Sequence, residues 1–207
     1  PGGALTTANI VETFEGASGF DNAGWTHQAV SGANDFVWSS AQAQTPTHSW
    51  HSPSLNSVSN RILVSPSFGV IASTTLSFWH TYAFESATSC FDAGTLETSV
   101  DGGTTWTVLP DAAFTAGLFT GTVSTGFSNP IGGKRAWCGG TIGAMTQVTA
   151  NLGAFAGQNI KLRWHAGDDS SAVVTGWFID SVTINDAGTA AMCSSVNPDA
   201  LFMNGFE

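Results

Sequence analysis

The sequence predicts an all-β protein, an antiparallel two-sheet sandwich or a barrel, and three observations predict it. Short apolar or alternating runs are separated by segments rich in Gly, Ser and Thr along the whole chain. No long window carries apolar side chains at the 3.6-residue period of an amphipathic helix. The stretch Thr95–Leu109 has the pattern of a tight hairpin. At 207 residues, one large sandwich with a sizeable core is the simplest organisation.

The hairpin prediction rests on two alternating runs around a turn sequence. Leu96, Thr98 and Val100 alternate with polar residues, which is the period of a half-buried strand. Asp101-Gly102-Gly103 follows, and such residues accept the positive φ that hairpin turns require. Trp106 and Val108 then resume the alternation.

We expect about nine or ten short strands in all. Thr74–Phe84 has large side chains on both faces, so it should be central or covered on both sides. Ile160–His165 alternates cleanly and should bury one face. Ala41–Asn56 is expected to be a loop, and Asp111–Gly143 a long irregular segment. The other expected strands are Ile10–Phe14, Phe36–Trp38, Arg61–Val64, Met145–Leu152 and Trp177–Ile184.

Charge narrows the classes of partner. The formal net charge is −10, with 15 acidic and five basic residues. Nucleic acid is excluded because its phosphates require a basic face, and an anionic membrane surface is disfavoured. The acidity is compatible with calcium or with solubility alone. No stretch approaches the ~20 apolar residues of a transmembrane segment.

The three cysteines favour an oxidising compartment. None lies in a C-x-x-C pair, so a structural zinc site is disfavoured. Cys90 and Cys138 both lie in loop-like surroundings and are predicted to form a disulfide, which leaves Cys193 as the odd residue; three unpaired thiols remain the alternative.

An ordered set of segments resembles the MAM-like jelly-roll modules of secreted bacterial proteins, such as those attached to immune inhibitor A-type metallopeptidases. The resemblance covers roughly Ile10–Asn185. It implies a jelly-roll (concanavalin-like) sandwich and a structural cation near the junction of the first and last strands. The segments are Phe14–Gly16, Gly24–Trp25, Thr75–Glu85, Phe91–Trp106, Asn151–Asp169 and Gly176–Ile184.

Two shorter resemblances add to this one. Ser99–Trp106 matches the Asp-box pattern S-x-D-x-G-x-T-W, which in sialidase propellers is a hairpin folding unit and not a catalytic one. A propeller would need the unit repeated, and one copy is present. The last residues resemble the NGFE-type tails of some exported bacterial proteins.

Asp180 is the most informative carboxylate. Its period-2 neighbours Phe178, Val182 and Ile184 are apolar, and a carboxylate on a core-facing row must be paired, ligated or neutralised. We expect it to bind calcium together with further carboxylates; the alternative is that it lies at a strand end or pairs with Arg163 or Arg61. The resemblance assigns Glu15, Asp92 and Asp180 to the metal site, and Asp35 is added from the residues alone. Asp168-Asp169 could hold a cation but reads as a solvated loop.

Aromatic residues give the second lead. Trp25, Trp50 and Trp137 are expected in loops, where they could stack on sugar rings or cap the ends of the core. No nucleophile elbow, H-E-x-x-H or P-loop pattern is present. Glu85 and Glu97 could face each other as paired carboxylates, although surface or turn roles are expected for them.

The sequence therefore predicts a calcium-stabilised, non-catalytic accessory module of a secreted or cell-surface bacterial protein. It would recognise carbohydrate or a surface partner. The alternatives are a spacer that stabilises a neighbouring hydrolase domain, and a glycan-active hydrolase. The chain starts at Pro1 without a signal sequence, so a larger precursor is expected. The expected organisation is a linker over residues 1–9, the sandwich over 10–186 and a tail over 187–207.

Overall fold

The protein is an antiparallel β-sandwich, which confirms the predicted fold class. The computed structural model describes residues 7–85 and 88–188. No α-helix occurs in these ranges; two 3₁₀ turns are present, η1 (Asp111–Ala113) and η2 (Gly153–Phe155). The strands are β1 (Thr7–Glu12), β2 (Thr26–Ser31), β3 (Val37–Ser39), β4 (Ser49–Pro53), β5 (Ser59–Val64), β6 (Phe68–Gly69), β7 (Thr75–Ala83), β8 (Ala93–Ser99), β9 (Thr107–Val108), β10 (Phe114–Ala116), β11 (Gly121–Thr122), β12 (Arg135–Ala136), β13 (Thr146–Asn151), β14 (Asn159–Asp168) and β15 (Gly176–Gly188).

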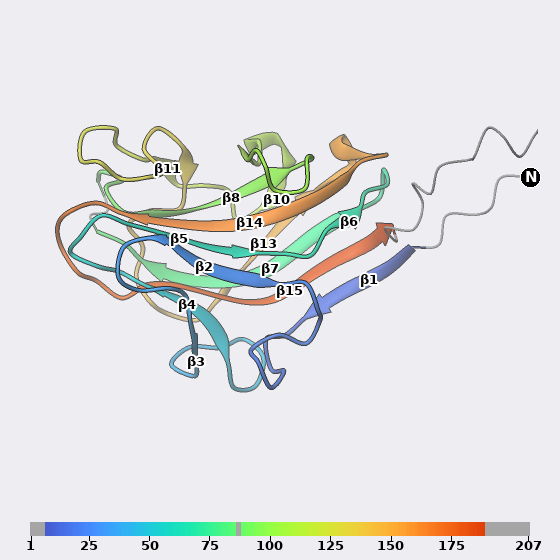
Figure 1. Cartoon of the computed structure of the whole chain (residues 1–207), viewed down its shortest axis with the longest axis horizontal. Coiled ribbons are helices and arrows are strands. Elements are labelled where there is room, and N and C mark those ends of the chain that lie inside the picture. The colour runs from blue at the N-terminus through green and yellow to red at the C-terminus, as the bar shows by residue number, and fades with distance from the viewer. Residues whose placement is uncertain (1–6, 86–87, 189–207) are drawn as a thin grey trace, which may run out of the picture.

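Two layers face each other across the core (Figure 1). Sheet A has the order β10-β13-β7-β15, and β15 pairs on its other edge with β4 and then with β1. Sheet B has the order β9-β8-β14-β5-β2. The short strand β6 pairs with both β14 and β15 and so joins the layers.

The core is filled by the inward rows of the long central strands. Ile160, Leu162 and Trp164 of β14 are all fully buried, as their alternation predicts. Leu76 and Phe78 of β7 meet them from the other layer, and β7 is central between β13 and β15, as predicted. The apolar row of each strand therefore decides which face points inward.

The hairpin is present. β8 and β9 pair at Glu97–Val108, and Gly102 and Gly103 have φ of 76° and 105°. The Asp101 carboxylate closes the turn by accepting the Thr105 amide at 2.9 Å and hydroxyl at 2.6 Å. β8 is buried on both faces because the segment between β10 and β13 covers its outer side.

Several expected boundaries were wrong. The region expected as a loop over Ala41–Asn56 contains β4, and β2 had no prediction because its residues are polar and exposed at a sheet edge. Residues 111–143 contain the short strands β10, β11 and β12 within otherwise irregular backbone. β1 begins at Thr7, ahead of the expected start at Ile10, and β15 reaches Gly188.

Candidate functional site

Asp180 does not lie on the core-facing row. The register of β15 shifts between Asp180 and Thr183, and Ser181 has a φ of 50°. This bulge changes the alternation, so Ile179 and Val182 both enter the core while Asp180 points to the outer side of sheet A. Phe178, Asp180 and Val182 were expected on one face of the strand, but the bulge after Asp180 places Val182 on the core-facing side instead.

Asp180 binds backbone amides instead of an arginine. It is fully buried and accepts the amides of Gln44 at 2.6 Å and Thr45 at 3.0 Å, and its neighbour Ser181 at 2.6 Å. Burial raises the pKa of Asp180, and these hydrogen bonds oppose the rise. The carboxylate fixes the segment that leads into β4.

Glu15 holds the same segment a few residues further on. Its carboxylate accepts the amides of Thr47 at 3.0 Å and His48 at 2.7 Å. Burial would raise the pKa of Glu15, but the Thr47 hydroxyl and these amides lower it to about 2. Asp35 lies apart, with His27 Nδ1 at 2.9 Å.

The fourth predicted ligand, Asp92, belongs to a different cluster. Glu85, Asp92 and Asp169 each offer a carboxylate oxygen within 4.8 Å of the others. In the described part of the chain this is the group of acidic residues that comes together, so the structure does not join Asp92 to Glu15, Asp35 and Asp180. Burial raises the pKa of Asp92 to about 7, and the neighbouring carboxylates add to the rise.

The Asp168-Asp169 pair is buried, so the solvated-loop interpretation was wrong. Asp168 and Asp169 are 0% and 2% exposed. Asp168 is bound by the Arg61 guanidinium and by the Ser59 hydroxyl, while Arg61 also donates to Pro53 O. Sequence reasoning missed this ion pair because both partners come from strands that carry inward apolar rows.

The three tryptophans proposed as sugar platforms lie in the core. Trp25, Trp50 and Trp137 are 5%, 3% and 1% exposed, so they have no open face for a ligand. Trp25 contacts Phe14 and Trp164, and Trp137 contacts Phe78. The alternative weighed from the sequence, capping of the core, describes their positions.

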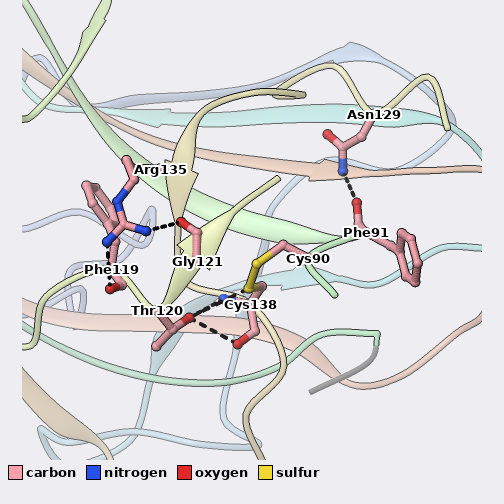
Figure 2. The surroundings of a disulfide bond; sticks show 8 residues. All are labelled: Cys90, Phe91, Phe119, Thr120, Gly121, Asn129, Arg135 and Cys138. Carbon is pink, nitrogen blue, oxygen red and sulfur yellow. Dashed lines mark hydrogen bonds between the residues drawn. A yellow bond between two sulfur atoms is a disulfide. The ribbon is translucent and has the colours of Figure 1, made fainter. Parts of the chain in front are cut away.

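The Cys90–Cys138 disulfide is present and holds the long segment after β9 against sheet B (Figure 2). Thr120 Oγ1 donates to Cys138 O at 3.2 Å and accepts the Cys138 amide at 2.9 Å. Asn129 Nδ2 reaches Phe91 O at 2.6 Å on the other side of the bridge. A disulfide is typical of proteins in an oxidising compartment. Cys193 lies outside the described residues.

One tryptophan that the sequence reasoning did not select lies partly exposed on a sheet face. Trp79 is on the outer side of β7, opposite Gln147 of β13, and is partly exposed. Within the described residues it has no ring partner and no hydrogen bond, unlike Trp38, which stacks on His48 at 4.0 Å, and Trp106, which carries the Arg163 guanidinium at 4.3 Å.

The cross-strand neighbours of Trp79 are the exposed Gln147 of β13 and the buried Asp180 of β15, and hydroxyl side chains lie further along the same strands. We call this surface the Trp79 face; it comprises Ser77, Trp79, Gln147, Thr149 and Thr183. Thr149 Oγ1 is paired with Thr115 Oγ1 at 2.6 Å. The face combines one flat apolar ring with polar groups that can donate and accept hydrogen bonds.

The two glutamates considered as a catalytic pair have separate environments. Glu97 is buried beneath Lys134, Arg163 and His165. Glu85 belongs to the cluster with Asp92 and Asp169. No helix long and apolar enough to cross a bilayer is found in the described ranges.

Comparison with known proteins supports the fold. The chain matches no protein-family model and no curated protein sequence. Among solved structures it is similar to the K2 cleaved adhesin domain of Lys-gingipain, a Porphyromonas gingivalis protein, with a TM-score of 0.50 and 17% identity over 86% of this chain and 99% of that one.

Two further structures have lower scores. The CBM22-1 xylan-binding domain of Paenibacillus barcinonensis Xyn10C has a TM-score of 0.47 and 12% identity, covering 91% of this chain and 100% of that one. The glycoside hydrolase domain of Endo-D from Streptococcus pneumoniae has a TM-score of 0.48 and 13% identity over 78% of this chain. The chain spans 22% of that Endo-D structure, so the likeness concerns a part of it.

Proposed function

We propose that the protein is a non-catalytic binding module of a secreted or cell-surface bacterial protein, and that it recognises carbohydrate through the Trp79 face. The observation that carries the proposal is the partly exposed ring of Trp79, which has no ring or hydrogen-bond partner among the described residues and lies on the outer side of β7. An indole that is buried or already stacked on another group cannot pack against a sugar ring. Trp25, Trp50 and Trp137 are buried in this way.

The chemistry of the face suits a sugar. The C–H groups on one side of a pyranose ring are apolar and pack on the electron-rich face of an indole. Around the ring, Gln147 can donate and accept hydrogen bonds with hydroxyl groups, and Ser77 and Thr183 add hydroxyls at the margins. Binding sites commonly pair an apolar surface with a few polar groups that set orientation.

Two properties of the chain agree with an extracellular accessory role. The disulfide favours an oxidising compartment. The net charge of −10 keeps the surface away from nucleic acid and anionic lipid. A xylan-binding domain and an adhesin domain are among the similar structures and motivate a carbohydrate screen, while the Trp79 face supplies the residues to test.

The test is a screen of the chain on a glycan array and on immobilised polysaccharides, followed by titration of the best ligand. Trp79→Ala should weaken binding at least about tenfold, because truncating a central aromatic anchor removes upwards of ~1.4 kcal/mol. Phe127→Ala is the matched control, since Phe127 is an exposed aromatic, 51% accessible, on a different segment.

The outcomes separate the candidate roles. If Trp79→Ala binds the glycan with the same affinity as the wild type, the binding site does not include the Trp79 face. Absence of any glycan binding by the wild type would favour the spacer that stabilises a neighbouring domain. If the protein releases shorter sugars from a bound glycan, the hydrolase alternative is favoured.

A further inference from the structure

Three acidic side chains meet at one end of the sandwich. Glu85 follows β7 of sheet A, Asp92 precedes β8 of sheet B, and Asp169 follows β14 of sheet B. Their nearest carboxylate oxygens lie within 4.8 Å of one another. Since these residues come from distant parts of the sequence, the fold itself brings like charges together.

One oxygen in this cluster is buried without a partner. Asp92 is 0% exposed; its Oδ1 accepts the Asp169 amide at 2.7 Å, and its Oδ2 has no hydrogen bond. Glu85 Oε2 is also enclosed and unpaired. A carboxylate oxygen removed from water without a donor is costly, so a positive group or a proton is needed beside it.

No basic side chain of the described residues supplies that charge through an ion pair. Arg61, which is buried, donates its hydrogen bonds to Asp168 and to Pro53 O. Lys134 and Arg163 bind Glu97, on the outer face of β8. Within the described residues the cluster therefore has no direct counter-charge, only the longer-range effect of Arg61 on Asp92.

We propose that Glu85, Asp92 and Asp169 form the binding site of a hard divalent cation, with Ca²⁺ as the first choice. The donors are carboxylate oxygens, and neither imidazole nor thiolate takes part; this set suits calcium better than zinc or copper. The ion joins the end of β7 in one sheet to β8 and β14 in the other.

This site differs from the one expected around Asp180. The oxygens of Asp180 are already occupied by the backbone amides of Gln44, Thr45 and Ser181, whereas Asp92 Oδ2 has no donor. The cation site shares no residue with the Trp79 face. Calcium binding can therefore be absent while sugar binding is retained, and sugar binding can be absent while calcium binding is retained.

The experiment titrates Ca²⁺ alone into EDTA-stripped protein by calorimetry and follows thermal unfolding with and without Ca²⁺, with Mg²⁺ and Na⁺ at matched ionic strength. The variants are Asp92→Asn and Glu85→Gln. The control is Asp111→Asn, an acidic residue with a 44% exposed side chain that pairs with Arg135. Glu85→Gln decides the result if Asp92→Asn does not fold, because Glu85 is partly exposed.

We expect Ca²⁺ to raise Tm by at least about 5 °C in the wild type and in Asp111→Asn. In Asp92→Asn and Glu85→Gln the Ca²⁺ affinity should fall at least about tenfold, with loss of the Tm shift. The proposal is overturned if the wild type shows no heat and no Tm shift up to about 10 mM Ca²⁺. It is equally overturned if the variants bind Ca²⁺ with the affinity of the wild type. It is also overturned if Asp92→Asn raises Tm in EDTA while Ca²⁺ changes the Tm of no variant, because the carboxylates would then be held together by a shared proton.

Discussion

Glu97 is a buried carboxylate that forms ion pairs and hydrogen bonds with three basic side chains. It is 0% exposed, with Lys134 Nζ at 2.5 Å, Arg163 Nε at 2.6 Å and His165 Nδ1 at 2.9 Å. Lys134 comes from the segment between β11 and β12, while the other two lie on β14. The carboxylate therefore fastens that segment to sheet B, and its own charge is required to do so.

Replacing this charge should be costly. Glu97→Gln should lower the free energy of unfolding by about 3 kcal/mol, because it leaves the partly buried Lys134 and Arg163 side chains without their counter-charge. Asp111→Asn, which breaks the exposed pair with Arg135, should cost no more than about 1 kcal/mol. Urea unfolding at pH 7 measures both. Equal effects of the two substitutions would show that the Glu97 network contributes no more than a surface ion pair.

Glu97 also makes the stability of the protein depend on pH in the acid range. Burial would raise the pKa of Glu97, but His165, Lys134 and Arg163 lower it to about 2 from an ordinary value of 4.5. Its stabilisation is therefore complete above about pH 4.5 and is lost as the pH falls from there through about 2. Between pH 5 and pH 3 the wild type should lose more stability than Glu97→Gln, as measured by unfolding at fixed pH steps. Parallel curves for the two proteins would contradict this assignment.

At the scale of the element, alternation predicted orientation wherever a strand is regular. The inward row of β14 follows directly from Ile160, Leu162 and Trp164. In β15 the same rule fails at one peptide, because Ser181 adopts a φ of 50° and the register shifts. Nothing local marks that bulge, since it depends on the amides of Gln44 and Thr45, which approach Asp180 from far along the chain. The face of Asp180 was therefore beyond prediction from the sequence.

β8 contains a glycine whose missing side chain makes room for an aromatic ring. A Cβ at Gly94 would lie less than 3.0 Å from the ring of Trp177, which packs across from β15. Gly94→Ala should therefore cost about 1–3 kcal/mol through overpacking. Gly143→Ala is the control because a Cβ there meets nothing within 4 Å. Chemical denaturation gives both values, and a Gly94→Ala protein as stable as the control would mean that the two sheets can separate freely at this point.

At the scale of the whole molecule, the long segments close the sides of the sandwich. Trp137 pairs through its backbone with Gly94 of β8, and its ring packs on Phe78 of β7, so one residue connects the two sheets. Trp25 contacts Trp164 on sheet B. A tryptophan in an irregular segment carries no periodic signal, and its burial depends on where that segment folds back. This is why the sequence left capping and ligand binding as alternatives for Trp25 and Trp137, whereas Trp50 lies on β4, in a region that was expected to be a loop.

The disulfide should make the largest single contribution to keeping the segment around Trp137 in place. Cys90 and Cys138 are 48 residues apart, and closing a loop of that length in the unfolded chain is worth about 4 kcal/mol in the chain-entropy treatment. The bridge lies beside a small apolar cluster in which Val123, Ile131 and Ala136 pack on Ala93 of β8. Removing it therefore loosens this packing as well as lengthening the free loop.

We expect the double variant Cys90→Ala/Cys138→Ala to fold with sheets intact but to lose up to about 4 kcal/mol of unfolding free energy. Both proteins should carry Cys193→Ala, so that thiol exchange does not enter the comparison. Urea unfolding measures the loss, and a reducing agent should lower the midpoint of the disulfide-containing protein alone. Protease cleavage between β9 and β13 should rise in the double variant, because the loop opens more often. A midpoint unchanged by the double substitution would mean that Trp137 and its neighbours hold this side of the sandwich without the bridge.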